Sequence, residues 1–133
     1  MTGLTAVVVY IIWTLLLTGL YALPRIPLVL TGKRRADNWE RTKAPSDPAF
    51  LIRAKGAHLN CLENLPLFAG LVFVAALLQK SAVVDALAAY VIYARVGQSV
   101  AHLLGTSLPL VLVRASLFLA QVVMMLFIAF RLL

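Results

Sequence analysis

The chain has 133 residues, of which 62% are hydrophobic and 13% charged, with a formal net charge of +7. A soluble domain of this composition would have too little polar surface to face water, so we expect the bilayer to be its solvent. A nucleic-acid partner is not expected, because eight of the twelve lysines and arginines lie between Arg25 and Lys55 rather than along a binding face. The length predicts a single domain, residues 1–133.

Four apolar stretches are long enough to cross a membrane, which takes about 20 helical residues each. We therefore predict an all-α integral membrane protein, a bundle of four transmembrane helices. The spans are expected at about residues 2–23, 57–79, 81–104 and 108–132. The apolar run of the first span continues past Pro24 and Pro27 to Leu30, so a kink is predicted there. Short turns separate the last three spans, which makes them antiparallel neighbours.

A basic loop, residues 25–56, follows the first span. The positive-inside rule places this loop in the cytoplasm with the turn after the third span, and both termini on the opposite side. The same charges suit contact with anionic membrane lipids. Within the loop, "ADNWER" is expected to form a short interfacial helix, and the helix of the second span is expected to begin near Pro48.

Polar side chains of three spans are predicted to meet near the loop side of the membrane. An ionisable group inside a span costs several kcal/mol unless it is paired or faces a wet cavity. The helical rise brings groups from the second, third and fourth spans to one level, with Arg95 one turn deeper. The groups concerned are Asn60, Glu63 and Asn64, then Arg95, Gln98 and His102, and finally Arg114.

Several interpretations of these residues remain open. Glu63 and Arg95 are expected to form a structural ion pair that fixes helix register. Asn60 and Asn64 equally suit hydrogen bonds between helices. If Glu63 is so engaged, Arg114 has no acid left in the membrane and either binds an external anion or extends to the interface. No metal site is expected, since the two histidines lie on different helices.

The second span carries "HLNCLENLP", with His58, Asn60, Cys61, Glu63 and Pro66 in a fixed spacing. This pattern resembles the second-helix signature of the MAPEG family, the membrane-associated proteins in eicosanoid and glutathione metabolism, and in particular its bacterial members. The likeness covers nearly the whole chain, including the basic first loop, "YARVGQSVAH" on the third span and "VRAS" on the fourth.

The resemblance implies a homotrimer, in the bacterial inner membrane, that binds glutathione between subunits near the cytoplasmic face. It implies a glutathione-dependent transferase or peroxidase, whose lipophilic small-molecule substrate arrives from the lipid. Carried over by position, Arg114 would be the catalytic residue that stabilises the glutathione thiolate. The glutathione ligands would be Arg34 or Arg35, Arg53, Asn60, Glu63, Gln98 and His102.

Two other functions compete with an enzyme. One is a non-catalytic lipid-binding scaffold of the same fold, in which the polar residues are structural. The other is a small multidrug transporter, which usually has an essential carboxylate in its first span; the first span here has no acid. The chain also departs from the family pattern at Gly56, where a family enzyme has an arginine, and at Asn64, Gln98 and His102, where aromatic residues or histidine are usual.

Overall fold

The computed structural model describes residues 1–44 and 46–133. In this part of the chain every regular element is helical, as predicted. The elements are α1 (Gly3–Ala22), α2 (Arg25–Leu30), the short 3-10 helix η1 (Ala36–Trp39), α3 (Ala49–Leu77), α4 (Ser81–Leu104) and α5 (Leu108–Leu132). The predicted loop helix is thus present as η1, and α3 begins one residue after Pro48.

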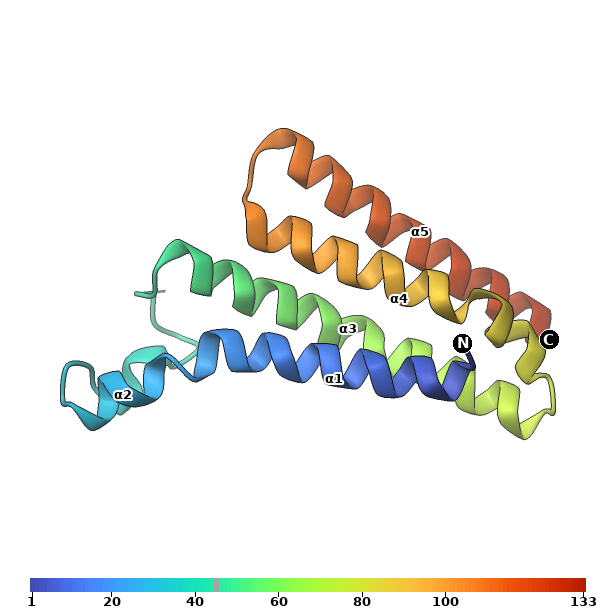
Figure 1. Ribbon diagram of the computed structural model, residues 1–133, viewed down its shortest axis with the longest axis horizontal. Helices are drawn as coiled ribbons and strands as arrows, with labels where there is room; N and C mark the ends of the chain where they lie inside the picture. Colours follow the sequence, from blue (N-terminus) through green and yellow to red (C-terminus); the bar gives the residue numbers. More distant parts are fainter. Residues whose placement is uncertain (45) are drawn as a thin grey trace.

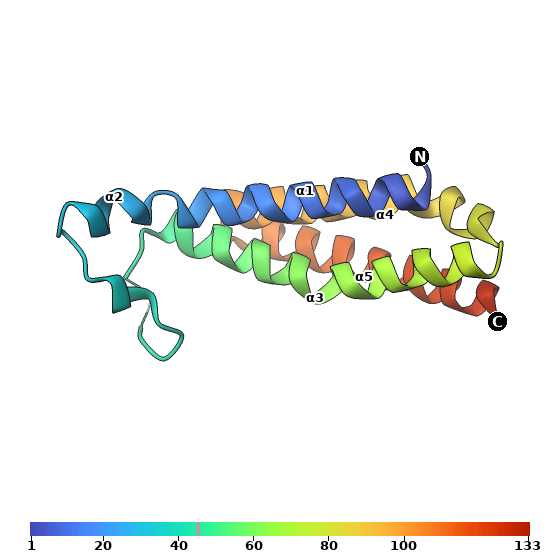
Figure 2. The ribbon, with the colours of Figure 1, turned by 90° about the horizontal axis from the view of Figure 1, so that it is seen from below.

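The four long helices lie side by side as two antiparallel pairs (Figure 1). α1 packs mainly against α3 and α4 mainly against α5, while contacts between α3 and α4 join the two pairs. Both termini lie at the same end as the turn between α3 and α4, and α2, the loop and the turn between α4 and α5 lie at the other end, in both views (Figure 2). The bundle therefore separates the basic loop from both termini.

The predicted interruption of the first apolar run is present. α1 ends at Ala22 and α2 begins at Arg25, directly after Pro24. Proline lacks a backbone N–H and its ring obstructs the preceding turn, which explains why the run is two helices and not one.

Three helical segments are long and apolar enough to cross a membrane, namely Gly3–Leu30, Ala49–Leu77 and Leu108–Leu132. α4 has a comparable length of 24 residues but is less apolar. Its polar side chains Arg95, Gln98 and Ser99 are buried inside the bundle, where they do not face lipid. By length and composition the structure thus supports three spans, and a fourth crossing by α4 stays a prediction.

Two hydrogen-bonded arrangements define the end of the bundle that holds the termini. Gly3 N, in the first turn of α1, donates to Oδ1 of Asp85 on α4 at 2.6 Å. The turn after α3 is a Schellman motif, in which Lys80 N donates to Ala75 O at 2.8 Å and Gln79 has a positive φ of 55°. This motif reverses the chain within a few residues and so makes α3 and α4 antiparallel neighbours.

Candidate functional site

Polar residues from three helices line an open groove between α3, α4 and α5, with a volume of ≈ 270 Å³. We call it the polar groove. Its lining consists of Asn60, Glu63, Gln98, Val111, Arg114, Ala115 and Phe118. Four of these are predicted site residues, so the structure brings together groups that lie up to 54 positions apart in the sequence (114 − 60).

Arg114 is half-buried in the second turn of α5. Its Nε is buried and has no hydrogen-bond partner, and none of the ion pairs among the described residues includes its guanidinium. Glu63 lines the same groove without forming an ion pair with it. A buried part of a cation without a partner is costly, so the groove is suited to an anionic group.

The predicted ion pair between Glu63 and Arg95 is not formed within the described chain. Arg95 is only 1% exposed, and its Nη1 donates to Oε1 of Gln98 at 2.8 Å, while Glu63 is exposed. Glu63 does not reach Arg95 because Cys61 and Asn64 occupy the inward face of α3. Successive helical residues are turned by about 100°, so Glu63 points away from the core and into the polar groove.

His102 lies beside the groove, at the loop end of the bundle. Its Nδ1 is 3.4 Å from Nδ2 of Asn60, and the neighbouring Leu103 O accepts a hydrogen bond from Nε of Arg53 at 3.0 Å. Gly56 faces the imidazole so closely that an added Cβ would lie 2.9 Å from its Cε1. Arg53 and His102 therefore sit next to the groove, and neither lines it.

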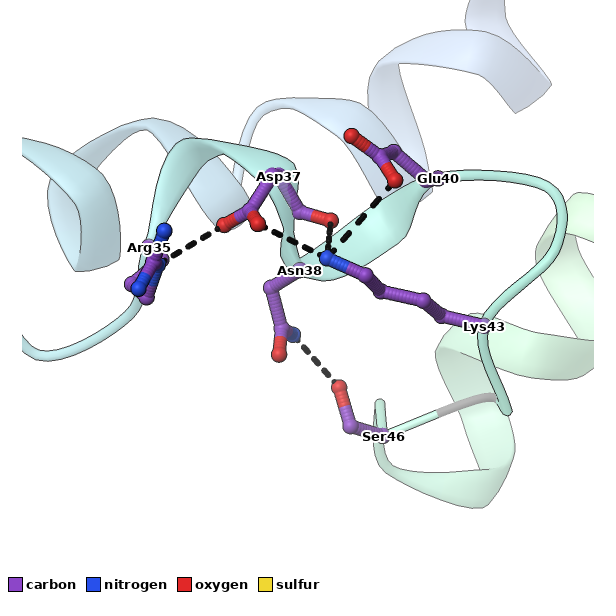
Figure 3. A network of polar contacts seen from close by, with 6 residues as sticks. All are labelled: Arg35, Asp37, Asn38, Glu40, Lys43 and Ser46. Atoms are coloured by element: carbon purple, nitrogen blue, oxygen red, sulfur yellow. Dashed lines mark hydrogen bonds and ion pairs between the residues drawn. The ribbon is translucent and has the colours of Figure 1, made fainter.

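The predicted ligands Arg34 and Arg35 are in the loop between α2 and η1 and do not line the groove of their own chain. Arg35 Nε pairs with Asp37 at 3.0 Å, and Lys43 Nζ pairs with Asp37 at 2.8 Å and with Glu40 at 3.7 Å (Figure 3). Hydrogen bonds from Lys43 and Arg35 hold the pKa of Asp37 below its usual range. The loop thus has its own ionic network, separate from the groove.

A second loop cluster was not anticipated from the sequence. Arg25 forms an ion pair with Asp47, and its Cζ lies over the rings of Tyr21 and Trp39, at 5.0 and 5.1 Å from their centroids. Nε1 of Trp39 also donates to Oδ1 of Asp47, at 2.8 Å. These contacts fasten η1 and the start of α3 to the end of α1. The sequence gives no more specific signal than one tryptophan and three acids, Asp37, Glu40 and Asp47, in a largely basic segment.

An apolar cavity of ≈ 280 Å³ continues along the same face, between α3 and α5. Its lining consists of Asn64, Leu67, Leu71, Val122, Met125, Leu126 and Ala129. Asn64 follows Glu63 directly, and Val122 lies one turn beyond Phe118, so the apolar cavity begins where the polar groove ends. Among the described residues, no group of three or more histidines, cysteines or carboxylates is placed to hold a metal ion.

Comparison with known proteins bears on the same residues. A family model, that of the MAPEG family, matches residues 3–133. No curated protein matches the chain, and no solved structure matches it. The family match spans all four long helices and confirms the resemblance seen in the second span. The chain therefore belongs to the MAPEG family.

Proposed function

We propose that this chain is a membrane-bound, glutathione-dependent transferase or peroxidase that acts on lipophilic electrophiles. Members of the MAPEG family generally use glutathione. The observation that carries the proposal is the half-buried guanidinium of Arg114, which has no ion-pair partner among the described residues and lines one groove with Asn60, Glu63 and Gln98.

The donor set of the polar groove fits glutathione. The tripeptide has two carboxylates, an amino group and a thiol. Arg114 suits an anionic group, Asn60 and Gln98 offer amides, and Glu63 is an acceptor for the amino group. These four side chains therefore match the charged and polar groups of the ligand.

The size and openness of the groove support a working unit of more than one subunit, which in this proposal is the homotrimer implied by the family resemblance. Ligand sites in proteins usually have volumes of about 300–1,000 Å³, and the open groove of one chain has ≈ 270 Å³. A neighbouring subunit would complete such a partial site. In this proposal the loop of the neighbour contributes Arg34 or Arg35, which do not reach the groove of their own chain.

The chemistry follows from the ionisation of the glutathione thiol. A free thiol has a pKa of about 8.5, and a nearby guanidinium favours the nucleophilic thiolate. In transfer, the thiol proton goes to water, sulfur bonds to the electrophilic carbon, and the leaving group departs with the bonding electrons. In peroxide reduction, sulfur takes the terminal oxygen and releases the alcohol; a second glutathione then converts the sulfenic acid to a disulfide and water.

The apolar cavity gives the lipophilic substrate a place beside the polar groove. It also favours a second candidate, a non-catalytic lipid-binding scaffold, because an apolar cavity would hold a lipid whether or not a thiolate is present. The two candidates differ only in what Arg114 does.

The proposed setting is the bacterial inner membrane, crossed by α1, α3, α4 and α5. The basic loop and the turn between α4 and α5 would face the cytoplasm, and both termini the opposite side. The grouping of these segments at opposite ends of the bundle supports this topology (Figure 1).

The test is isothermal titration of the detergent-purified protein with glutathione, together with the thiolate absorbance of the bound ligand. We expect binding by the unchanged protein, and in Arg114→Ala a lost thiolate signal and a conjugation rate lower by about a hundredfold. Arg131→Ala is the matched control, because Arg131 is an exposed arginine in the last turn of the same helix. An unchanged protein that shows no thiolate absorbance would favour the scaffold, and unchanged binding and absorbance in Arg114→Ala would show that Arg114 does not stabilise the thiolate.

A further inference from the structure

The side-chain amide of Gln98 is held in one orientation. Its Oε1 accepts two hydrogen bonds, from Nη1 of Arg95 at 2.8 Å and from Nε2 of Gln121 at 3.0 Å. Arginine can only donate, so the atom of Gln98 that faces Arg95 is the oxygen. The NH₂ group therefore points away from both donors.

The NH₂ group of Gln98 is accessible from the polar groove. It makes no hydrogen bond with the described residues, and Nε2 of Gln98 is not among the buried atoms left without a partner. Gln98 as a residue is only 5% exposed, and it lines the groove together with Arg114. The NH₂ group thus has two N–H donors left for a ligand in the groove that Gln98 and Arg114 line.

Arg95 stands directly behind this amide and has no acidic partner among the described residues. It is 1% exposed, its Nε and Nη2 are buried without hydrogen-bond partners, and its Cζ lies 5.4 Å from the ring centroid of Tyr10. An unpaired guanidinium at this depth destabilises the bundle. A role limited to stability does not account for such an arrangement.

We propose that Arg95 is a positioning residue: together with Gln121 it holds the amide of Gln98 so that the NH₂ group donates to an anionic group of glutathione bound beside Arg114. This inference rests on the proposed function of the groove. The positive charge of Arg95, one hydrogen bond of 2.8 Å away from the amide, also attracts an anion at the groove electrostatically. Hydrogen bonds from Arg95 and Gln121 thus connect the core of the bundle to the amide of Gln98 at the groove.

The experiment combines glutathione titration with thermal unfolding of the detergent-purified full chain. Gln98→Glu keeps the size of the side chain, removes both donors and places a carboxylate against Arg95. We expect glutathione binding to weaken by about ten- to hundredfold, and the melting temperature to rise, because the buried cation gains a partner. The matched control is Gln79→Glu, the same change in the exposed turn after α3, which should alter neither quantity.

Two changes at Arg95 separate positioning from plain structural support. Arg95→Met removes the charge and the donor while filling a similar volume; we expect weaker glutathione binding with no loss of thermal stability. Arg95→Lys retains a charged donor and should restore most of the affinity. If Arg95 only supported the fold, loss of stability would accompany loss of binding in Arg95→Met.

The outcomes distinguish this inference from the proposed function. Binding of glutathione by Gln98→Glu as tight as by the unchanged protein would overturn the inference and leave the proposed function standing. A melting temperature of Gln98→Glu that does not rise would overturn the orientation of the amide. If the unchanged protein does not bind glutathione, the proposed function fails, and glutathione fails as the ligand of the Gln98 amide. A higher melting temperature of Gln98→Glu would then still support the orientation of that amide.

Discussion

Gly56 of α3 and His102 of α4 fit together so closely that a methyl group on Gly56 would lie 2.9 Å from Cε1 and 3.1 Å from Nε2 of the imidazole. Gly56→Ala must therefore displace the imidazole of His102. We expect the free energy of unfolding to fall by up to about 2 kcal/mol, because overpacking costs about 1–3 kcal/mol and alanine regains up to about 1 kcal/mol of helix propensity inside α3. Thermal or denaturant unfolding in detergent measures this change.

A double variant provides the control for that contact. His102→Ala removes the ring and leaves space at position 56, so Gly56→Ala should cost much less in the His102→Ala background. The interaction energy of such a cycle isolates the contact between the two residues. Equal costs in both backgrounds would show that the two side chains do not meet.

Asp85 is expected to stabilise the start of α1, because its Oδ1 accepts from Gly3 N at 2.6 Å. The first N–H groups of a helix have no partner within the helix. Asp85→Ala should lower the free energy of unfolding by about 1 kcal/mol, as the loss of a helix cap does. Asp85→Asn keeps an acceptor oxygen, so its free energy of unfolding should lie between those of the unchanged protein and Asp85→Ala. Equal stability of Asp85→Ala and the unchanged protein would contradict this role.

Asp47 is expected to control the order of the loop, since it accepts from both Arg25 and Trp39. Asp47→Ala leaves both donors without their partner, and the loop should lose about 2 kcal/mol of protection against opening. Hydrogen exchange of the amides in η1 measures that opening. As a control, exchange in the middle of α5, far from the loop, should stay unchanged.

The network around Asp37 is expected to weaken at low pH and to stay unchanged as the pH rises above the range in which Asp37 titrates. Hydrogen bonds from Lys43 and Arg35 lower the pKa of Asp37, so its contribution to loop order is complete above the unfolded value, about 3.9. It is lost as the pH falls through the lower folded value. Titration of the Asp37 carboxyl by NMR should give a midpoint below the usual range, and Asp37→Asn should abolish the transition; a midpoint at the usual value would refute the network.

Much of the fold could be read from local features of the chain. The helices follow apolar runs, the break at Pro24 follows from proline, and the short turns enforce antiparallel packing. The polar groove was also partly predictable, because helical rise alone brings Asn60, Gln98 and Arg114 to one level. The level of a residue along its helix follows from the number of residues between it and the helix end, so the sequence alone predicts it.

The partners of the charged groups could not be predicted in the same way. Arg95 was expected to pair with Glu63, but it points inward to Gln98 and Tyr10, and Glu63 lies in the groove with Arg114. Which side of a helix faces which neighbour depends on the rotation of each helix in the bundle. That rotation is set by all packing contacts together and is not encoded in the spacing of a few polar residues.

The sequence by itself determined the solvent, the helices, the basic loop and the family, because composition and short-range spacing suffice for each. Only the tertiary structure decided that Arg114, Gln98 and Glu63 share a groove, and that the loop arginines lie away from it in one chain. It also decided the orientation of the Gln98 amide. Hydrogen bonds are directional over about 3 Å, so they are fixed only once the helices have packed.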